Sequence, residues 1–263
     1  MAPIRTCLAA ALCVLPLQAW ADAPAMKLDY DVYAGGIFLV SGGMTLDLDS
    51  DRYKASVEAK GGRLIDLLSR WSYRASADGR VEGGAKVEPE RFQSDRQTRS
   101  RHRKLSMGYD KAGKVSVTAE PPQSDLSANA VSPEFRPNTL DPVSAAVGVI
   151  AASGQTGCSG TFPVFDGRRR YDVIVTSNGP DTLQKSSRNM HQGAAEKCTI
   201  RIHPVAGFER DREDGEFFQY GVDRTATAWF AEPMPGQARV PVRIQVDLDW
   251  INVVMNLVSA SKA

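Results

Sequence analysis

The sequence predicts a mainly β protein, in which one long, curved antiparallel sheet forms a half-open barrel or β-spiral around a single packed helix. Apolar residues recur at every second position over most of the chain, and turn-forming residues separate the alternating stretches. A complete set of helix-boundary signals occurs at one place, near residues 141–152. The alternation looks alike on both sides of the Pro-rich stretch 120–142, so the sheet is expected to be continuous.

The first 21 residues have the features of a secretory leader. Arg5 precedes an almost wholly apolar run over residues 7–17, and Ala19-Trp20-Ala21 places small residues at the two positions that a signal peptidase recognises. The run is too short to cross a bilayer as a stable helix. We therefore expect cleavage after Ala21, a single β-rich domain over residues 22–263, and a periplasmic location.

The first three strands are expected where apolar and polar residues alternate. Gly35-Gly36 and Asp49-Ser50-Asp51 supply the reversals between them. A short helical turn is expected over residues 64–68, after which the strand pattern resumes until Asp78-Gly79 closes it. The apolar positions of these four stretches are Leu28, Tyr30 and Val32; Met44, Leu46 and Leu48; Tyr53, Ala55, Val57 and Ala59; and Trp71, Tyr73, Ala75 and Ala77.

The stretch 120–142 predicts a long irregular crossing that ends at the one clear helix. Asp141 stands at the N-cap position, Pro142 in the first turn, where its missing N–H costs nothing, and Gly154 beyond the end. One face of the helix is expected to carry Val143, Ala146, Val147 and Ile150.

Strand patterns return after the helix. Asp166-Gly167 predicts a hairpin between residues 164–165 and 168–175. Ile200 and Ile202 follow Cys198 on one strand face, and residues 217–230 predict a strand pair. The last element is a strand over residues 240–250, which alternates without interruption and begins, or runs along an edge, near Pro241.

Composition excludes several classes of partner. The leader carries one cation and no acid, so the 32 basic and 31 acidic residues of the whole chain become 31 of each in the mature chain. This balance gives no basis for binding nucleic acid. No apolar run after the leader reaches membrane length. No cofactor is expected, since there is no glycine-rich phosphate loop, and the mature protein is expected to be a monomer.

Cys158 and Cys198 remain once the leader is removed. In an oxidising compartment two such cysteines are expected to bond to each other. A reactive thiol or a metal ligand is the alternative, but there is no C-x-x-C spacing, and His102, His191 and His203 are isolated from one another. We therefore predict a disulfide and no metal site.

No constellation of residues specifies a reaction, and no catalytic residue is assigned. The G-x-S-x-G motif of hydrolases is absent from the sequence. Two groups of carboxylates could serve a glycosidase by residue type alone, but no spacing supports them. They are Asp247 with Asp249, and Asp211 with Glu213 and Asp214.

Arg99, Arg101 and Arg103, in the basic stretch 91–104, have two interpretations. On one face of a strand, the three guanidinium groups would converge on an anion such as a phosphate. Alternatively, they are the charges of a solvated edge strand, where they discourage edge-to-edge pairing. The second interpretation is favoured.

Short segments along the mature chain resemble the periplasmic domain-of-unknown-function family 3108. They are Leu28-Asp29-Tyr30-Asp31-Val32-Tyr33-Ala34-Gly35-Gly36, Pro89-Glu90-Arg91-Phe92, Leu140-Asp141-Pro142-Val143-Ser144, Val164-Phe165-Asp166-Gly167-Arg168 and Pro241-Val242-Arg243-Ile244. The resemblance covers about residues 26–258. It implies a secreted, mostly antiparallel β protein of envelope-bearing bacteria, with a curved sheet similar to that of the lipoprotein-localisation factors. It implies no established activity and no catalytic residues.

Together these features favour a non-enzymatic cell-envelope protein that binds a lipid or another amphiphile on a concave apolar sheet face. Ordinary core packing is the alternative for each candidate lining residue, with the helix and aromatic side chains filling the concave face. A second function class is an interaction module that supports envelope integrity by docking onto a periplasmic or outer-membrane protein, and a third is a hydrolase. The candidate lining residues are Trp71, Tyr73, Tyr171, Val173, Ile244, Val246 and Trp250.

Overall fold

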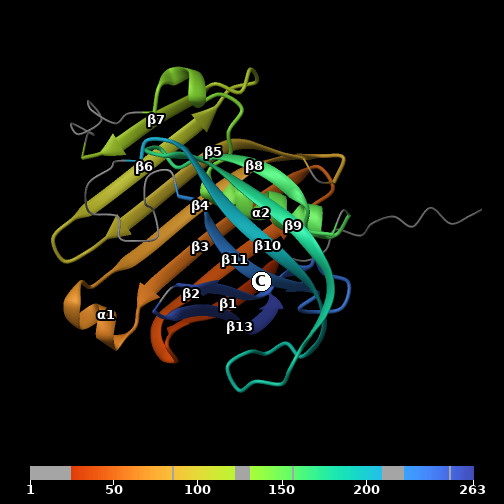
Figure 1. Ribbon diagram of the computed structural model, residues 1–263. Helices are drawn as coiled ribbons and strands as arrows, with labels where there is room; N and C mark the ends of the chain where they lie inside the picture. The colour runs from red at the N-terminus through yellow and green to blue at the C-terminus, as the bar shows by residue number, and fades with distance from the viewer. Residues whose placement is uncertain (1–24, 85, 122–130, 156, 209–221, 249) are drawn as a thin grey trace, which may run out of the picture.

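The computed structural model describes residues 25–84, 86–121, 131–155, 157–208, 222–248 and 250–263 (Figure 1). The predicted leader lies outside these ranges, as do Asp249 and the acidic candidates Asp211, Glu213 and Asp214. The strands of the described part are β1 (Met26–Ala34), β2 (Ile37–Leu48), β3 (Arg52–Gly61), β4 (Ser72–Glu82), β5 (Lys86–Gln97), β6 (His102–Tyr109), β7 (Val115–Glu120), β8 (Gly160–Phe165), β9 (Arg170–Leu183), β10 (Gly193–Ala206), β11 (Arg224–Ala231), β12 (Val240–Asp247) and β13 (Asn252–Lys262); the helices are α1 (Arg63–Leu68), α2 (Pro142–Ser153) and a 3₁₀ turn at Pro133–Phe135.

All 13 strands of the described chain join one antiparallel sheet, in the order β7-β6-β5-β4-β3-β2-β1-β13-β12-β11-β10-β9-β8. Every neighbour in this order is also a neighbour in sequence, except the central pair β1 and β13, where Met26 lies opposite Lys262. The sheet therefore consists of two meanders, β1–β7 and β8–β13, joined at the middle. It is open, with β7 and β8 as its edges, and the predicted fold class is confirmed.

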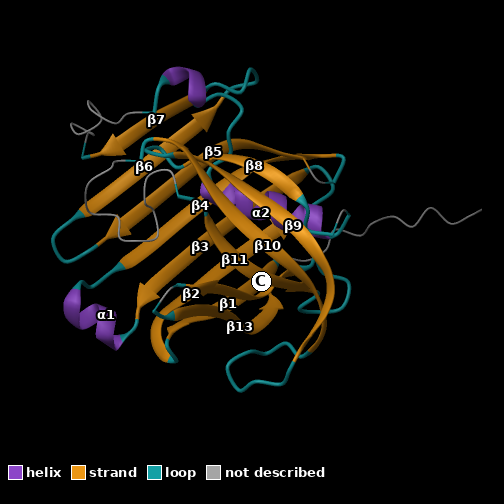
Figure 2. Cartoon of the chain, in the orientation of Figure 1, coloured by secondary structure: helices purple, strands orange, loops and turns teal. Residues whose placement is uncertain are grey.

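The two meanders curl toward each other around α2 (Figures 1 and 2). The helix contacts β3, β4 and β5 of one meander and β8 and β12 of the other. Residues Pro142–Ser153 contain no charged side chain, which is typical of a helix that is covered on nearly all sides. The sequence predicted one buried face, and Val143, Val147 and Ile150 of that face are buried. Most of the remaining helix surface is buried as well, so the prediction was too narrow. The fourth residue of the predicted face, Ala146, is exposed.

The predicted helix start is confirmed in detail. The Asp141 carboxylate accepts hydrogen bonds from the backbone N–H groups of Val143 and Ser144, both at 2.9 Å. The Ser144 hydroxyl donates to the same carboxylate and lies 2.6 Å from the Tyr53 hydroxyl on β3. This chain of hydrogen bonds fixes the first turn of α2 against the sheet.

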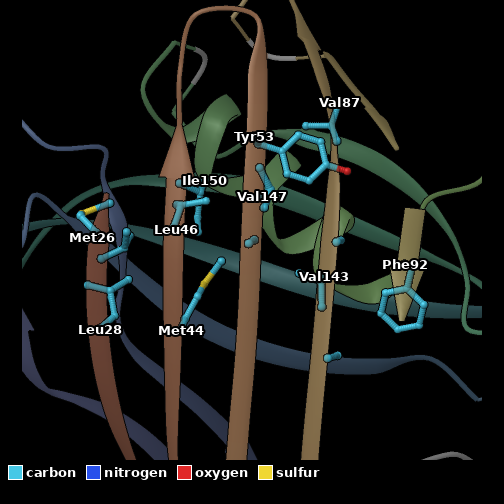
Figure 3. Packing of buried hydrophobic residues seen from close by; sticks show 14 of the residues in the cluster. Met26, Leu28, Met44, Leu46, Tyr53, Val87, Phe92, Val143, Val147 and Ile150 are labelled. Carbon is cyan, nitrogen blue, oxygen red and sulfur yellow. The ribbon is translucent and has the colours of Figure 1, made fainter. Parts of the chain in front are cut away.

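The main core lies between α2 and the first meander. Inward side chains of β1, β2 and β3, including Leu28, Leu46 and Tyr53, belong to one buried cluster with Val147 and Ile150 of the helix (Figure 3). These are the positions that the period-two pattern places on one sheet face. Burial of this face against the helix removes apolar surface from water, which is the main stabilising contribution to the fold.

The predicted end of β4 at Asp78-Gly79 is wrong, because the strand continues to Glu82. The pairing register with β5 shifts between Asp78 and Gly79, which marks a β-bulge. A Cβ atom on Gly79 would collide with the backbone carbonyl oxygen of Glu88. Glycine is needed here for close approach of two strands and not for a turn.

The basic stretch 91–104 is two strands and a turn, so the prediction of a single strand is wrong. The Thr98 N–H donates to the Arg101 carbonyl at 2.7 Å, and the Thr98 hydroxyl oxygen accepts from the Arg101 N–H at 3.0 Å. Arg99 and Arg101 therefore lie in the β5–β6 turn, and Arg103 lies on β6. Both β5 and β6 are interior strands, which also contradicts the edge-strand interpretation.

The predicted terminal strand over residues 240–250 is divided by a turn. Leu248 and Ile251 exchange backbone hydrogen bonds of 3.0 and 3.3 Å, and the chain reverses into β13, which the sequence analysis missed. Trp250 continues the alternation across this turn, so the pattern alone does not reveal the break. The described part of residues 217–230 contains one strand, β11, where a strand pair was expected.

Candidate binding cavity

An apolar cavity of about 450 Å³ lies beside α2 on the concave side of the sheet. It exists because the helix covers only part of the sheet's inner face. On β1, Leu28 packs in the core, whereas Val32 borders the cavity; on β2, Leu46 packs in the core and Val40 borders the cavity. The cavity is therefore a continuation of the core surface beyond the reach of α2.

Both meanders and the helix form its wall. Glu58 is the one charged residue among the described residues of the wall, and it alternates with the inward Val57 and Ala59, so its side chain projects from the opposite face. The wall consists of Tyr30, Val32, Val40, Gly42, Gly43, Met44, Val57, Glu58 and Ala59 from β1–β3; Pro142, Ala145, Ala146, Val149 and Ile150 from α2; and Val164, Tyr171, Val173, Ile200, Ile202, Phe230, Pro241, Ile244 and Met255 from the second meander.

Small residues keep this space open. Gly42 occupies an inward position of β2 between Val40 and Met44, and lies opposite Ala59 of β3. On the helix side, Ala146 is the exposed residue that borders the cavity. A leucine or aromatic residue at any of these positions would fill part of the space, as happens in an ordinary core.

Two tyrosine hydroxyls provide polar groups on an otherwise apolar wall. Burial raises the pKa of both Tyr30 and Tyr171, so each phenol is neutral at physiological pH. Neither hydroxyl hydrogen-bonds to another residue in the described part of the chain. Each of these two residues that border the cavity therefore keeps an unused hydrogen-bond donor.

The structure brings Tyr171, Val173 and Ile244 together at this cavity. The other four predicted lining residues lie elsewhere. Tyr73 packs against the core, where burial raises its pKa to about 12, and Trp250 is 72% exposed in the β12–β13 turn. Trp71, just before β4, and Val246, on β12, are half-buried away from this wall.

Sequence reasoning missed the cavity residues of the first meander and the small residues. Val32 and Val40 lie on the same inward strand faces as the core residues, so the period-two pattern does not separate them from the core. The one signal that could have identified them as cavity residues is their position near the ends of their strands. Gly42 and Ala59 interrupt a bulky inward pattern, and such an interruption is the local sign of an unfilled space.

A larger hollow of about 650 Å³ lies on the outer face of the first meander. Charges of alternating sign cross it from strand to strand, since Arg74 lies opposite Glu58 and Asp95, and Asp95 lies opposite Lys104. Such rows stabilise a hydrated sheet face. The smaller inner cavity is the better candidate for an apolar ligand, because no charged side chain points into it from the described strands and helix that form its wall.

The predicted disulfide between Cys158 and Cys198 is confirmed, with Cα atoms 6.6 Å apart. The carboxylate of Glu196 lies near the two sulfur atoms. It accepts hydrogen bonds from the Ser177 hydroxyl at 2.7 Å and from the Arg239 guanidinium at 2.8 Å. The two sulfur atoms are thus bonded to each other, and the Glu196 carboxylate is paired with Arg239. Together these contacts connect β9, β10 and the segment before β12.

The arginines of the basic stretch do not share a face. The Arg99 guanidinium donates to the Leu67 carbonyl at 3.1 Å, and the Arg99 N–H donates to the Ser69 carbonyl at 2.7 Å. Arg99 therefore anchors the β5–β6 turn to α1. Asp247, a carboxylate candidate, is exposed at the end of β12 and accepts a hydrogen bond from Gln245 at 2.8 Å.

Neither α-helix of the described chain has both the length and the apolar character needed to cross a membrane.

Comparison with curated proteins gives no match. Among solved structures, the chain is similar to a crystal structure from Brucella abortus described as a beta-barrel-like protein of domain of unknown function DUF1849. The TM-score is 0.48 and the sequence identity 11%, over 91% of this chain and 98% of that chain. A family model described as "Protein of unknown function (DUF3108)" matches residues 29–258, which is most of the chain. The chain therefore belongs to the DUF3108 family of proteins of unknown function.

Proposed function

We propose that this protein is a non-enzymatic periplasmic carrier that holds the apolar chain of a lipid or another amphiphile in the inner cavity. The observation that carries the proposal is a cavity of about 450 Å³ whose inward-facing side chains are uncharged. Cavities of this size with apolar walls and a few polar groups are typical of small-molecule sites. Each methylene group that leaves water contributes about 0.8 kcal/mol, so an acyl chain has a strong reason to enter.

The wall also constrains the chemistry of the ligand. A charged headgroup would stay outside, because burying an unpaired charge costs several kcal/mol. Tyr30 and Tyr171 can donate hydrogen bonds to an ester, hydroxyl or amide oxygen at the end of the buried chain. An uncharged acyl or isoprenoid chain linked to a neutral oxygen group fits these walls best.

Two features of the chain support a periplasmic location. The predicted leader over residues 1–21 directs export, and the Cys158–Cys198 disulfide suits an oxidising compartment. The periplasm of an envelope-bearing bacterium meets both requirements and is rich in amphiphiles.

Ala146→Trp tests the proposal, because it places a large side chain in the cavity from an exposed position of α2. The matched control is Ser56→Trp, which adds the same side chain to the opposite face of β3. Each protein is purified from its native host, its fold is checked by circular dichroism, and its bound lipids are measured by mass spectrometry.

The wild-type protein and Ser56→Trp are expected to carry a stoichiometric amphiphile. In Ala146→Trp the amount of bound amphiphile is expected to fall to about a tenth or less. A binding free energy that is weaker by about 1.4 kcal/mol already lowers the affinity tenfold. An empty wild-type protein would contradict carriage, and so would equal occupancy of the folded Ala146→Trp variant.

A further inference from the structure

One end of the molecule carries a group of exposed apolar side chains, here called the apolar rim. It combines α1, the start of β2 and the β12–β13 turn. Leu67, Leu68 and Trp250 are 72%, 69% and 72% exposed. The rim consists of Ile37, Phe38, Leu64, Leu67, Leu68 and Trp250.

Backbone contacts link the neighbouring parts of the rim in turn, from α1 to β2 and from the turn before β2 to the start of β13. The Gly62 N–H at the start of α1 donates to the Leu39 carbonyl at 2.7 Å, and a Cβ atom on Gly62 would lie 2.6 Å from the Phe38 ring. The Gly35 N–H before β2 donates to the Asn252 carbonyl at 3.0 Å, just after Trp250. The exposed side chains of the rim therefore lie at one end of the sheet, on segments that are held in place next to one another.

The leucines of α1 have no role in the core. No residue of this six-residue helix is buried. A helix this short is marginal by itself, so it depends on its anchors, which include the two hydrogen bonds from Arg99. The fold thus holds α1 in place while its apolar side chains face outward, although exposed apolar groups of this kind are unfavourable in water.

Basic residues surround these leucines. The stretch 60–70 contains Lys60, Arg63 and Arg70 against one acid, Asp66, and the Arg99 guanidinium lies on the Leu67 carbonyl. The whole chain has a formal net charge of only +1, so a net charge of 3 − 1 = +2 within this one stretch is a local excess. Leucine and tryptophan side chains beside arginines are typical of surfaces that lie in the interface of an anionic membrane.

We infer that the apolar rim docks onto the surface of an anionic phospholipid membrane. Leu67, Leu68 and Trp250 enter the interface, and the flanking cations contact lipid phosphates. This contact goes beyond the proposed function, since it requires no occupant in the cavity. A role of this contact in loading the cavity with a lipid rests on the proposed function. Val40 and Ala59 of the cavity wall lie near the strand ends that meet the rim. Docking would therefore place the cavity beside the acyl chains of the membrane.

The test is co-sedimentation of the purified protein with vesicles of phosphatidylcholine, with and without phosphatidylglycerol. The double variant Leu67→Ser/Leu68→Ser removes the most exposed leucines, and Arg63→Gln removes one flanking charge. Phe135→Ser is the matched control, because Phe135 is 46% exposed but lies in the crossing between β7 and α2.

The wild-type protein and Phe135→Ser are expected to bind the anionic vesicles, and added salt should weaken this binding. The double serine variant is expected to lose at least about tenfold in partitioning and Arg63→Gln about fivefold, as one basic residue near such a surface contributes that much. Wild-type protein that ignores anionic vesicles overturns the inference, as does binding that the double variant retains.

Capture of a soluble envelope protein through the rim, in place of vesicles, would likewise overturn the membrane contact and identify a protein partner. The inference and the proposed function fail separately. Ala146→Trp is expected to bind vesicles like the wild-type protein while losing its amphiphile, whereas the double serine variant tests the rim with the cavity intact.

Discussion

At the scale of single residues, Asp141 is a buried carboxylate held at the start of α2. It is fully buried and accepts three hydrogen bonds from the first turn of α2. Even so, burial raises the pKa of its carboxyl to about 6, because loss of water outweighs these hydrogen bonds. The cap position was predictable from Asp141-Pro142, but its burial depends on the sheet that closes over it.

Asp141 makes stability depend on pH in a defined direction. The unfolded carboxyl has a pKa of about 3.9, so between about pH 4 and pH 6 the folded protein keeps a proton that the unfolded chain releases. This contribution is full below about pH 4 and is lost as pH rises to about 6, by an amount on the order of 3 kcal/mol.

Urea unfolding of the wild-type protein and Asp141→Asn across this pH range checks the prediction. Asparagine stays neutral and keeps an oxygen for the N–H groups of Val143 and Ser144. The wild-type protein should lose stability relative to the variant from about pH 4 to pH 6 and then level off. A constant difference over the whole range would show that the carboxyl does not titrate there.

The candidate site illustrates what a residue pattern can and cannot reveal. Alternation correctly placed Tyr171, Val173 and Ile244 on inward strand faces. It placed Tyr73 on an inward face as well, and that residue packs in the core. Which inward residue is covered depends on where α2 lies, and that depends on contacts with strands far away in sequence.

At the scale of elements, the two α-helices have opposite roles. The second, α2, is covered by both meanders and provides the core against which five strands pack. The first, α1, is anchored to the sheet through backbone groups and leaves its leucines exposed. The sequence predicts α1 from a short apolar stretch and α2 from its boundary residues and apolar face, and neither signal distinguishes a buried helix from an exposed one.

This difference predicts unequal effects of substitution. Val147→Ala in α2 is expected to cost about 2 kcal/mol, because Val147 is fully buried and the shorter side chain leaves a gap in the core. Leu67→Ser in α1 is expected to change stability by about 0.5 kcal/mol or less. Chemical denaturation of the two variants measures both effects, and a larger loss for Leu67→Ser would show that α1 does support the core.

Turns limited the prediction of the strands. The β5–β6 turn contains Arg99 and Arg101 and no glycine, proline or aspartate, and it depends on Thr98 bonding to the Arg101 backbone. The β12–β13 turn preserves the alternation through Trp250. Both reversals are stabilised by pairing of the strands on either side, which is a long-range interaction that a local pattern does not contain.

At the scale of the whole molecule, the curl of the sheet depends on links between distant segments. The β8–β9 turn packs on the first meander, where a Cβ atom on Gly167 would lie 2.6 Å from the Leu105 side chain of β6. The disulfide joins the segment before β8 to β10 across the intervening β9. It therefore constrains the edge of the second meander, which forms part of the cavity wall.

Removal of the disulfide is expected to destabilise the protein without changing its topology. The bond closes a loop of 40 residues, and the chain-entropy model gives a stabilisation of about 4 kcal/mol for a loop of this length. Thermal unfolding of Cys158→Ser/Cys198→Ser against the oxidised wild-type protein measures the loss. The reduced wild-type protein should match the double variant, and unfolding temperatures that do not differ would refute the prediction.

The sequence by itself predicts the mainly β class and the inward and outward faces of the strands. It also predicts the capped helix at Asp141 and the partners of the disulfide. Each depends on neighbours a few positions apart or, for the disulfide, on one pair of the four cysteines lying outside the predicted leader. The open edges at β7 and β8, the unfilled part of the concave face and the exposed rim on α1 were not readable in this way. The unfilled part of the concave face arises because a helix of 12 residues covers less than the full length of the strands that curl around it, and that mismatch is a property of the packed molecule.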